Sequence, residues 1–154
     1  MYKYGLNTGE WYYQFIEPRI IAEKFLLDNT DYKFHCVHGK VKWVQVIWDR
    51  PSAREAIFTP DGRITDLHMD EKMWHTPEGG KYPGDSAWQE MTDLAQLLSP
   101  PWRYVRVDLY YWKQPWFGEL TFHPRAGCYK SRDEKTFGEM LDIDLTRKFE
   151  PVVV

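Results

Sequence analysis

Apolar and polar side chains alternate along residues 104–112 and again along residues 116–122, with a short polar break between the two runs. Alternation with a period of two is typical of β-strands, and a short turn between two such runs joins them as antiparallel neighbours. The pattern therefore predicts a hairpin. Its loop is expected to be even in length and centred on Lys113 and Gln114.

The register of this hairpin decides which side chains share a face. An even loop places Asp108 directly opposite Glu119, and on the same face it places Arg106 opposite Thr121. The opposite face is then purely apolar, with Val105, Val107, Leu109, Leu120 and Phe122. An odd loop would set Asp108 against an apolar residue and mix the two faces, so the apolar pattern favours the even register.

Two carboxylates that face each other across a ladder repel unless a positive charge lies between them. A divalent cation would supply that charge, and Mg²⁺ prefers the hard oxygens of carboxylates and hydroxyls, here Asp108, Glu119 and Thr121. On the same face, Arg106 could meet phosphate oxygens or pair with one of the two acids. The alternative is a solvated sheet face on which the acids tolerate each other across water.

Further stretches of the chain are predicted to add strands to the sheet. Residues 32–37 and 40–48 predict a hairpin around His38 and Gly39 that sets Phe34 opposite Trp43 and Cys36 opposite Val41 on an apolar face. Its other face carries Lys33, His35, Lys40 and Lys42, a basic surface that could receive phosphates or simply lie in solvent. Residues 19–27 predict a buried strand or short segment, and residues 56–64 a short hairpin.

Helical spacing of apolar residues predicts one long helix from Ser86 to Leu98, ended by the prolines that follow, and a short helix after Thr136. The fold class is therefore α+β, with an antiparallel sheet of about five strands, one long helix and one short helix. We expect residues 1–154 to form a single domain.

Composition narrows the functional classes. The net charge of -3 gives no reason to expect nucleic acid, and no apolar run is long enough for a membrane span or a signal peptide core. Two cysteines make no disulfide framework, so a cytoplasmic location is expected. Trp, Tyr and Phe make up 17% of the chain. Exposed aromatics such as Trp74, Trp112 and Trp116 would suit a second function, a non-catalytic carbohydrate-binding module.

Five ordered motifs, spread from about Glu10 to Gly127, together resemble the TupA-like ATP-grasp family. They are Pro18-Arg19-Ile20-Ile21-Ala22-Glu23-Lys24-Phe25-Leu26, Asp31-Tyr32-Lys33-Phe34, His38-Gly39-Lys40-Val41, Val105-Arg106-Val107-Asp108-Leu109-Tyr110 and Gly118-Glu119-Leu120-Thr121-Phe122. The family consists of ligases linked to polymers of the bacterial cell surface, often grouped beside glycosyltransferases. Teichuronopeptide or polysaccharide synthesis is the implied process.

The resemblance implies a role for each matching residue. Backbone groups of a hinge strand at Glu23, Lys24 and Phe25 would bind adenine, and Leu26 would line its pocket. Asp31 would hold the ribose hydroxyls. Arg106 would stabilise the transferring phosphoryl group, while Asp108 and Glu119 would bind Mg²⁺. The wider superfamily carries Glu-x-Asn where this chain has Glu119-Leu120-Thr121, and a hydroxyl is a poorer magnesium ligand than an amide oxygen.

The implied activity is ATP- and Mg²⁺-dependent joining of a carboxylate to an amine, both substrates being unidentified. The superfamily places a first grasp subdomain, with phosphate-clamping lysines, before the hinge strand. Nothing before Arg19 corresponds to it. The resemblance therefore implies that this chain matches the C-terminal part of such an enzyme. A separate chain would supply the first subdomain, and this chain alone would turn over no ATP.

Overall fold

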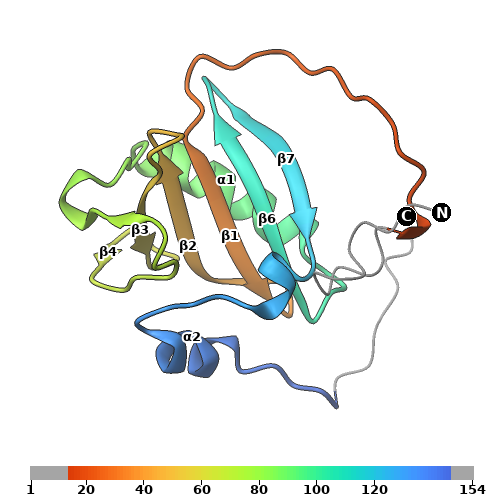
Figure 1. The fold of residues 1–154 in the computed structure, drawn as a ribbon, viewed down its shortest axis with the longest axis vertical. Helices are drawn as coiled ribbons and strands as arrows, with labels where there is room; N and C mark the ends of the chain where they lie inside the picture. Colours follow the sequence, from red (N-terminus) through yellow and green to blue (C-terminus); the bar gives the residue numbers. More distant parts are fainter. Residues whose placement is uncertain (1–13, 147–154) are drawn as a thin grey trace.

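The structure, a computed structural model, describes residues 14–146, and its centre is a seven-stranded sheet (Figure 1). The strand order is β4-β3-β2-β1-β6-β7, all antiparallel, and β5 pairs with β3 in parallel. The strands are β1 (Asp31–Val37), β2 (Lys40–Trp48), β3 (Arg54–Phe58), β4 (Ile64–Thr65), β5 (Trp74–His75), β6 (Tyr104–Tyr111) and β7 (Pro115–Thr121). The helices are α1 (Asp85–Leu98) and α2 (Glu134–Leu141), with the 3₁₀ turns η2 (Pro77–Gly79) and η3 (Pro124–Gly127). The predicted α+β class is confirmed.

One face of the sheet is apolar and is covered by α1, which lies behind the sheet in Figure 1. The helix buries Trp88, Met91 and Ala95, whose spacing of three and four residues places them on one side. They pack on strand residues that alternate toward this face, including Phe34 on β1 and Val107 on β6. The predicted apolar face of the β6–β7 hairpin is thereby confirmed.

The other face is polar and yet largely buried. The segment from η3 through α2 crosses its lower part in Figure 1, and Trp43, Ile57, Met69 and Phe137 form a small apolar cluster there. The buried polar residues of the central strands include Lys33, His35, Gln45, Glu55, Arg106 and Asp108. The solvated alternative therefore does not hold for Lys33, Arg106 and Asp108, whose burial requires that they be paired, whereas Glu119 on the same face is exposed.

The β6–β7 register confirms the predicted pairing of Asp108 with Glu119, by a route that differs from the expected one. The loop spans residues 112–114 and is odd in length, not even. A β-bulge at Gly118 adds one residue to β7 before Glu119, so Leu109 pairs with Phe117. The odd loop and the bulge compensate for each other. The apolar pattern thus predicted the faces correctly although the loop length was wrong.

Gly118 is held close to the neighbouring strand. A Cβ atom there would lie 2.9 Å from the backbone oxygen of Asp108. We expect Gly118→Ala to lower the free energy of unfolding by roughly 1–3 kcal/mol, because backbone atoms must move to admit the methyl group. The matched control is Gly138→Ala in α2, where a Cβ meets nothing within 4 Å.

Alanine at position 138 should raise stability by roughly 0.5–1 kcal/mol, since glycine is the poorer helix former. Urea unfolding of the two variants beside the wild-type chain measures both changes. A Gly118→Ala chain as stable as the wild type would contradict the close approach at the bulge.

The β1–β2 hairpin departs from prediction through a second bulge. Cys36 pairs with Val41 as expected, but Lys42 is an extra residue on β2, so His35 pairs with Trp43 and Phe34 with Val44. The predicted pairing of Phe34 with Trp43 is wrong. Because one extra residue reverses the faces, Trp43 joins the polar face and stacks on His35, with ring centroids 4.5 Å apart.

The predicted buried strand at residues 19–27 is also wrong. This segment has no regular secondary structure and runs outside the sheet beyond β7 (Figure 1). Its apolar side chains Ile20, Ile21 and Phe25 are exposed. Within residues 14–146 no strand pairs with it, and an extended segment without a partner can neither bury its apolar face nor complete a ladder.

Candidate functional site

A cluster of charged side chains lies on the polar face of the three strands β1, β6 and β7. The cross-strand register creates it, because Lys33 pairs with Asp108 and Asp108 pairs with Glu119. Its members are Asp31 and Lys33 from β1, Arg50 from the β2–β3 connection, Arg106 and Asp108 from β6, and Glu119 and Thr121 from β7. The structure therefore brings together the sequence-predicted residues of all three strands.

Asp108 is the centre of the cluster. Arg106 donates to both of its carboxylate oxygens, from Nε to Oδ1 at 2.6 Å and from Nη2 to Oδ2 at 2.7 Å. Lys33 Nζ donates to Oδ2 of Asp108 and forms an ion pair with Oδ2 of Asp31 at 2.7 Å. Two buried cations thus share one buried carboxylate, an arrangement in which each charge is compensated.

The guanidinium nitrogen Nη2 of Arg106 marks a point where three oxygens converge. Asp108 Oδ2 lies 2.7 Å away, Thr121 Oγ1 3.0 Å and Glu119 Oε1 3.1 Å. A positive charge does lie between the two facing acids, and it belongs to an arginine. Within the described residues, no group of three or more His, Cys, Asp or Glu side chains is arranged to hold a metal.

The cluster is buried at one end and exposed to solvent at the other. The side chain of Asp108 is 3% exposed, whereas that of Glu119 is 59% exposed and that of Arg50 is 50% exposed. Burial alone would lower the pKa of Arg106, but the hydrogen bonds and charge of Asp108 outweigh it and raise that pKa. Arg106 is therefore a fixed cation, and the open end can admit an anionic ligand.

Asp31 joins the cluster from the start of β1. Its Oδ2 atom contacts Lys33 and lies 3.4 Å from Nη2 of Arg50, while its buried Oδ1 has no hydrogen-bond partner among the described residues. Arg50 was only one of several loop arginines in the sequence, and its neighbour Arg54 pairs with Asp49 instead. The contact with Asp31 singles out Arg50 as a member of the site.

The predicted adenine-binding residues lie apart from this cluster. Glu23, Lys24 and Phe25 are exposed on the extended segment, and Leu26 is half-buried. Lys24 makes a cation–π contact with the sheet: its Nζ lies 6.0 Å from the ring centroid of Trp116 on β7. Their binding role remains a prediction.

Sequence reasoning missed Tyr129. Its hydroxyl accepts a hydrogen bond from Nη1 of Arg106 at 3.3 Å, whereas Glu119 contacts Nη2, so this tyrosine is a further member of the cluster. It follows the turn at η3, in a stretch without periodicity, and no spacing signal indicated it. Burial raises the pKa of Tyr129, although Arg106 opposes this, so the hydroxyl keeps its proton.

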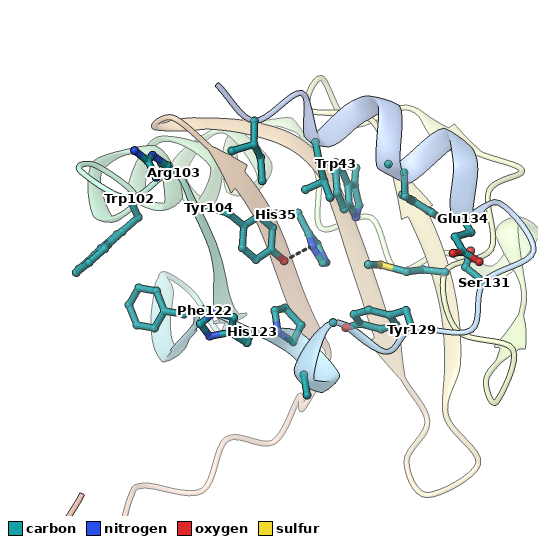
Figure 2. A pocket seen from close by; sticks show the side chains of 18 residues that line it. His35, Trp43, Trp102, Arg103, Tyr104, Phe122, His123, Tyr129, Ser131 and Glu134 are labelled. Carbon is teal, nitrogen blue, oxygen red and sulfur yellow. Dashed lines mark hydrogen bonds between the residues drawn. The ribbon is translucent and has the colours of Figure 1, made fainter. Parts of the chain in front are cut away.

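A cavity of about 1070 Å³ is lined in part by Tyr129 (Figure 2), the residue that also contacts Arg106 of the cluster. Its lining is mainly apolar, and it includes residues of β1, β2, β6, η3 and α2. Sequence reasoning also missed this feature, because its wall includes Trp43, which the unexpected bulge turned toward the polar face.

The exposed tryptophans that would serve a sugar platform do not lie together. Trp74 is on β5 beside β3, whereas Trp112 and Trp116 belong to the β6–β7 hairpin at the other edge of the sheet. Strands β2 and β1 separate the two positions. A flat stacking surface shared by all three is therefore excluded.

Comparison with known proteins gives one family. A model of the TupA-like ATPgrasp family matches residues 3–143, nearly the whole chain. Searches of curated proteins and of solved structures gave no match. Within the described residues, no helix has the length and apolar character needed to cross a membrane.

Proposed function

Because the chain belongs to the TupA-like ATP-grasp family, we propose that the charged cluster binds the phosphates of ATP together with Mg²⁺, as part of an ATP-dependent carboxylate–amine ligase. One observation carries the proposal. Three oxygens from Asp108, Glu119 and Thr121 converge on one cationic nitrogen, with further cations beside them. A sheet face that alternates fixed acids and bases in this way suits a phosphate chain and its counterion.

The oxygens of Asp108, Glu119 and Thr121 fit Mg²⁺ in chemistry. All are hard ligands, and Arg106 Nη2 occupies the point on which they converge, so this nitrogen would have to turn toward the phosphates when the ion binds there. These residues would hold the ion. Mg²⁺ supplies charge compensation for phosphate oxygens and orients them.

Arg106 and Lys33 would bind the phosphate oxygens that the ion leaves free. In the proposed reaction, an oxygen of the substrate carboxylate attacks the γ-phosphorus, and the bond from phosphorus to the bridging oxygen of ADP breaks. The amine nitrogen then attacks the acyl carbon, phosphate leaves with the electron pair of the carbon–oxygen bond, and the nitrogen releases a proton to the departing phosphate or to water. Fixed cations at Arg106 and Lys33 would stabilise the charge that spreads over the equatorial oxygens.

The nucleoside would extend toward the segment at residues 23–26. That segment is exposed and extended, so its backbone donors and acceptors are open to adenine. Asp31 would accept hydrogen bonds from the ribose hydroxyls, since its Oδ1 has no partner in the described part of the chain. The carboxylate and amine substrates would belong to the synthesis of a cell-surface polymer, such as teichuronopeptide.

Titration of ¹⁵N-labelled chain with ATP, with and without Mg²⁺, tests the proposal. We expect saturable NMR shifts in β1, β6 and β7 only when both are present. The dissociation constant should exceed about 1 µM, which corresponds to less than about 8 kcal/mol, because one wall of a site holds the nucleotide weakly.

Glu119→Gln should abolish the dependence on Mg²⁺. The matched control is Glu90→Gln on α1, an exposed carboxylate on the far face of the sheet, which should leave binding unchanged. Shifts confined to α1, or equal effects of the two variants, would reject the site. Saturable binding of oligosaccharides from a glycan panel, with no response to Mg²⁺ and ATP, would favour the carbohydrate-binding alternative.

A further inference from the structure

The cavity beside the cluster has the size and lining of a small-molecule site. Its volume of about 1070 Å³ is at the upper end of the range of about 300–1,000 Å³ found for ligand pockets. Six of its eighteen lining residues are Trp, Tyr or Phe, among them Trp43, Tyr104, Phe122, Tyr129 and Phe137. Figure 2 shows Trp43, Tyr104 and Tyr129 along the sheet, and Phe137 belongs to α2. A flat, apolar ring is the ligand part that such a wall accommodates.

Two buried nitrogen atoms of this wall have no hydrogen-bond partner among residues 14–146. They are Nε2 of His35 and Nε1 of Trp43, and both side chains are at most 2% exposed. The other ring nitrogen of His35, Nδ1, lies 2.9 Å from the hydroxyl of Tyr104 (Figure 2). The indole N–H can only donate, and an unpaired buried donor is costly, so a ligand acceptor atom that reached it after a small shift of the wall would relieve that cost.

The cavity and the charged cluster share a boundary. His35 is paired with Arg106 across the β1–β6 ladder, and Tyr129 both lines the cavity and accepts a hydrogen bond from Arg106. An acceptor group bound at His35 would therefore lie next to the cations of the cluster. Because this group must accept hydrogen bonds and tolerate a cationic neighbour, a carboxylate suits it best.

We propose that this cavity binds the carboxylate substrate, and that the substrate is a small acid built on a planar apolar ring. The ring packs among the aromatic side chains around Trp43 and Phe137, and the carboxylate lies toward His35 and Tyr129. The inference rests on the proposed function, because the acid can be a substrate only if the neighbouring charged cluster binds the phosphates of ATP.

Ligand-observed ¹⁹F NMR with 4-fluorophenylacetate tests this assignment. We expect saturable line broadening with that probe, and binding at least about tenfold weaker for 4-fluorotoluene, which has the ring without the carboxylate, and for difluoroacetate, which has the carboxylate without the ring. Trp43→Phe keeps a ring at the wall but removes the N–H. It should weaken 4-fluorophenylacetate binding about tenfold.

The matched control is Trp88→Phe. Trp88 is equally buried, and its indole N–H donates to the backbone oxygen of Pro60 at 2.9 Å on the other face of the sheet. This variant should bind the probe as the wild type does, so it separates a local loss from a general loosening of the core. Absence of binding to the wild-type chain, or equal losses in the two variants, would overturn the proposal.

A titration of the same samples with ATP and Mg²⁺ distinguishes this proposal from the proposed function. Nucleotide binding without binding of the fluorinated acid rejects only the cavity assignment. Acid binding without nucleotide binding rejects the assignment of the acid as substrate, since no phosphate then lies beside it.

Discussion

Asp108→Ala is expected to lower the free energy of unfolding by about 3–5 kcal/mol, the usual cost of removing one partner from a buried ion pair. The side chain of Asp108 is 3% exposed and receives hydrogen bonds from both Arg106 and Lys33. Both cations are themselves buried. After the substitution, Lys33 retains only Asp31, and Arg106 retains the contacts with Glu119, Thr121 and Tyr129. Urea unfolding at neutral pH measures the loss.

Glu119→Ala is the matched control, because the same cation contacts this acid from the open side. Its side chain is 59% exposed, and an exposed pair contributes about 0–1 kcal/mol. Both variants remove a proposed magnesium ligand, so both should lose the Mg²⁺-dependent response to ATP. Only Asp108→Ala should also lose stability. Equal losses in stability would mean that Asp108 is not the centre of the buried cluster.

The alternating apolar pattern was sufficient to predict the part of the fold that carries the cluster. Val105, Val107 and Leu109 must face the core, and this alone places Arg106 and Asp108 on the other face. The pairing with Glu119 followed from keeping the apolar residues of β7 on the same side. Side-chain alternation is a strong constraint, because a shift of one residue would bury charge and expose the core.

The two bulges could not be predicted from alternation. At Lys42 the sequence Val41-Lys42-Trp43 alternates as a regular strand would, yet the structure places Val41 and Trp43 in different clusters. What decides the outcome is the space beneath α2, where the Trp43 ring packs against Phe137. That contact joins residues far apart in the chain, and no local pattern records it.

Burial of the polar face was likewise invisible in the sequence. Lys33 and His35 alternate with apolar residues as solvated side chains do, and their burial depends on partners far along the chain, Asp108 for Lys33 and Tyr104 for His35. The loop at residues 66–73 contributes through Glu55, a buried carboxylate that accepts hydrogen bonds from the backbone nitrogens of Met69 at 2.7 Å and Asp70 at 3.1 Å. Long-range anchoring of this kind converts an alternating strand into a site with two buried faces.

The stability of the chain is expected to fall as the pH drops below about 6.5, and His35 is the main single cause. Burial lowers the pKa of His35 well below its usual value, and the charges of Arg106 and Lys33 lower it further. Below pH 6.5 the unfolded chain binds a proton at this histidine, whereas the folded chain does not. Acid therefore favours unfolding, by about 1.4 kcal/mol per pH unit, until the pH reaches the folded-state pKa.

His35→Phe removes this proton-binding group and keeps a ring against Trp43. Between pH 6.5 and 5.5, the wild-type chain should lose about 1 kcal/mol more stability than the variant, because the slope reaches its full value only where the unfolded histidine is fully protonated; urea unfolding at each pH measures the difference. Tyr104→Phe is the control: it removes the hydroxyl that lies 2.9 Å from Nδ1 but leaves the histidine buried, so it should lower stability at every pH without removing the slope. Other titrating groups, including His75, whose pKa burial also lowers, are present in all three chains and cancel in the comparison. If His35→Phe and the wild type showed the same slope, the His35 ring would have to accept its proton in the folded chain, and the neutral, closed environment derived for it would be wrong.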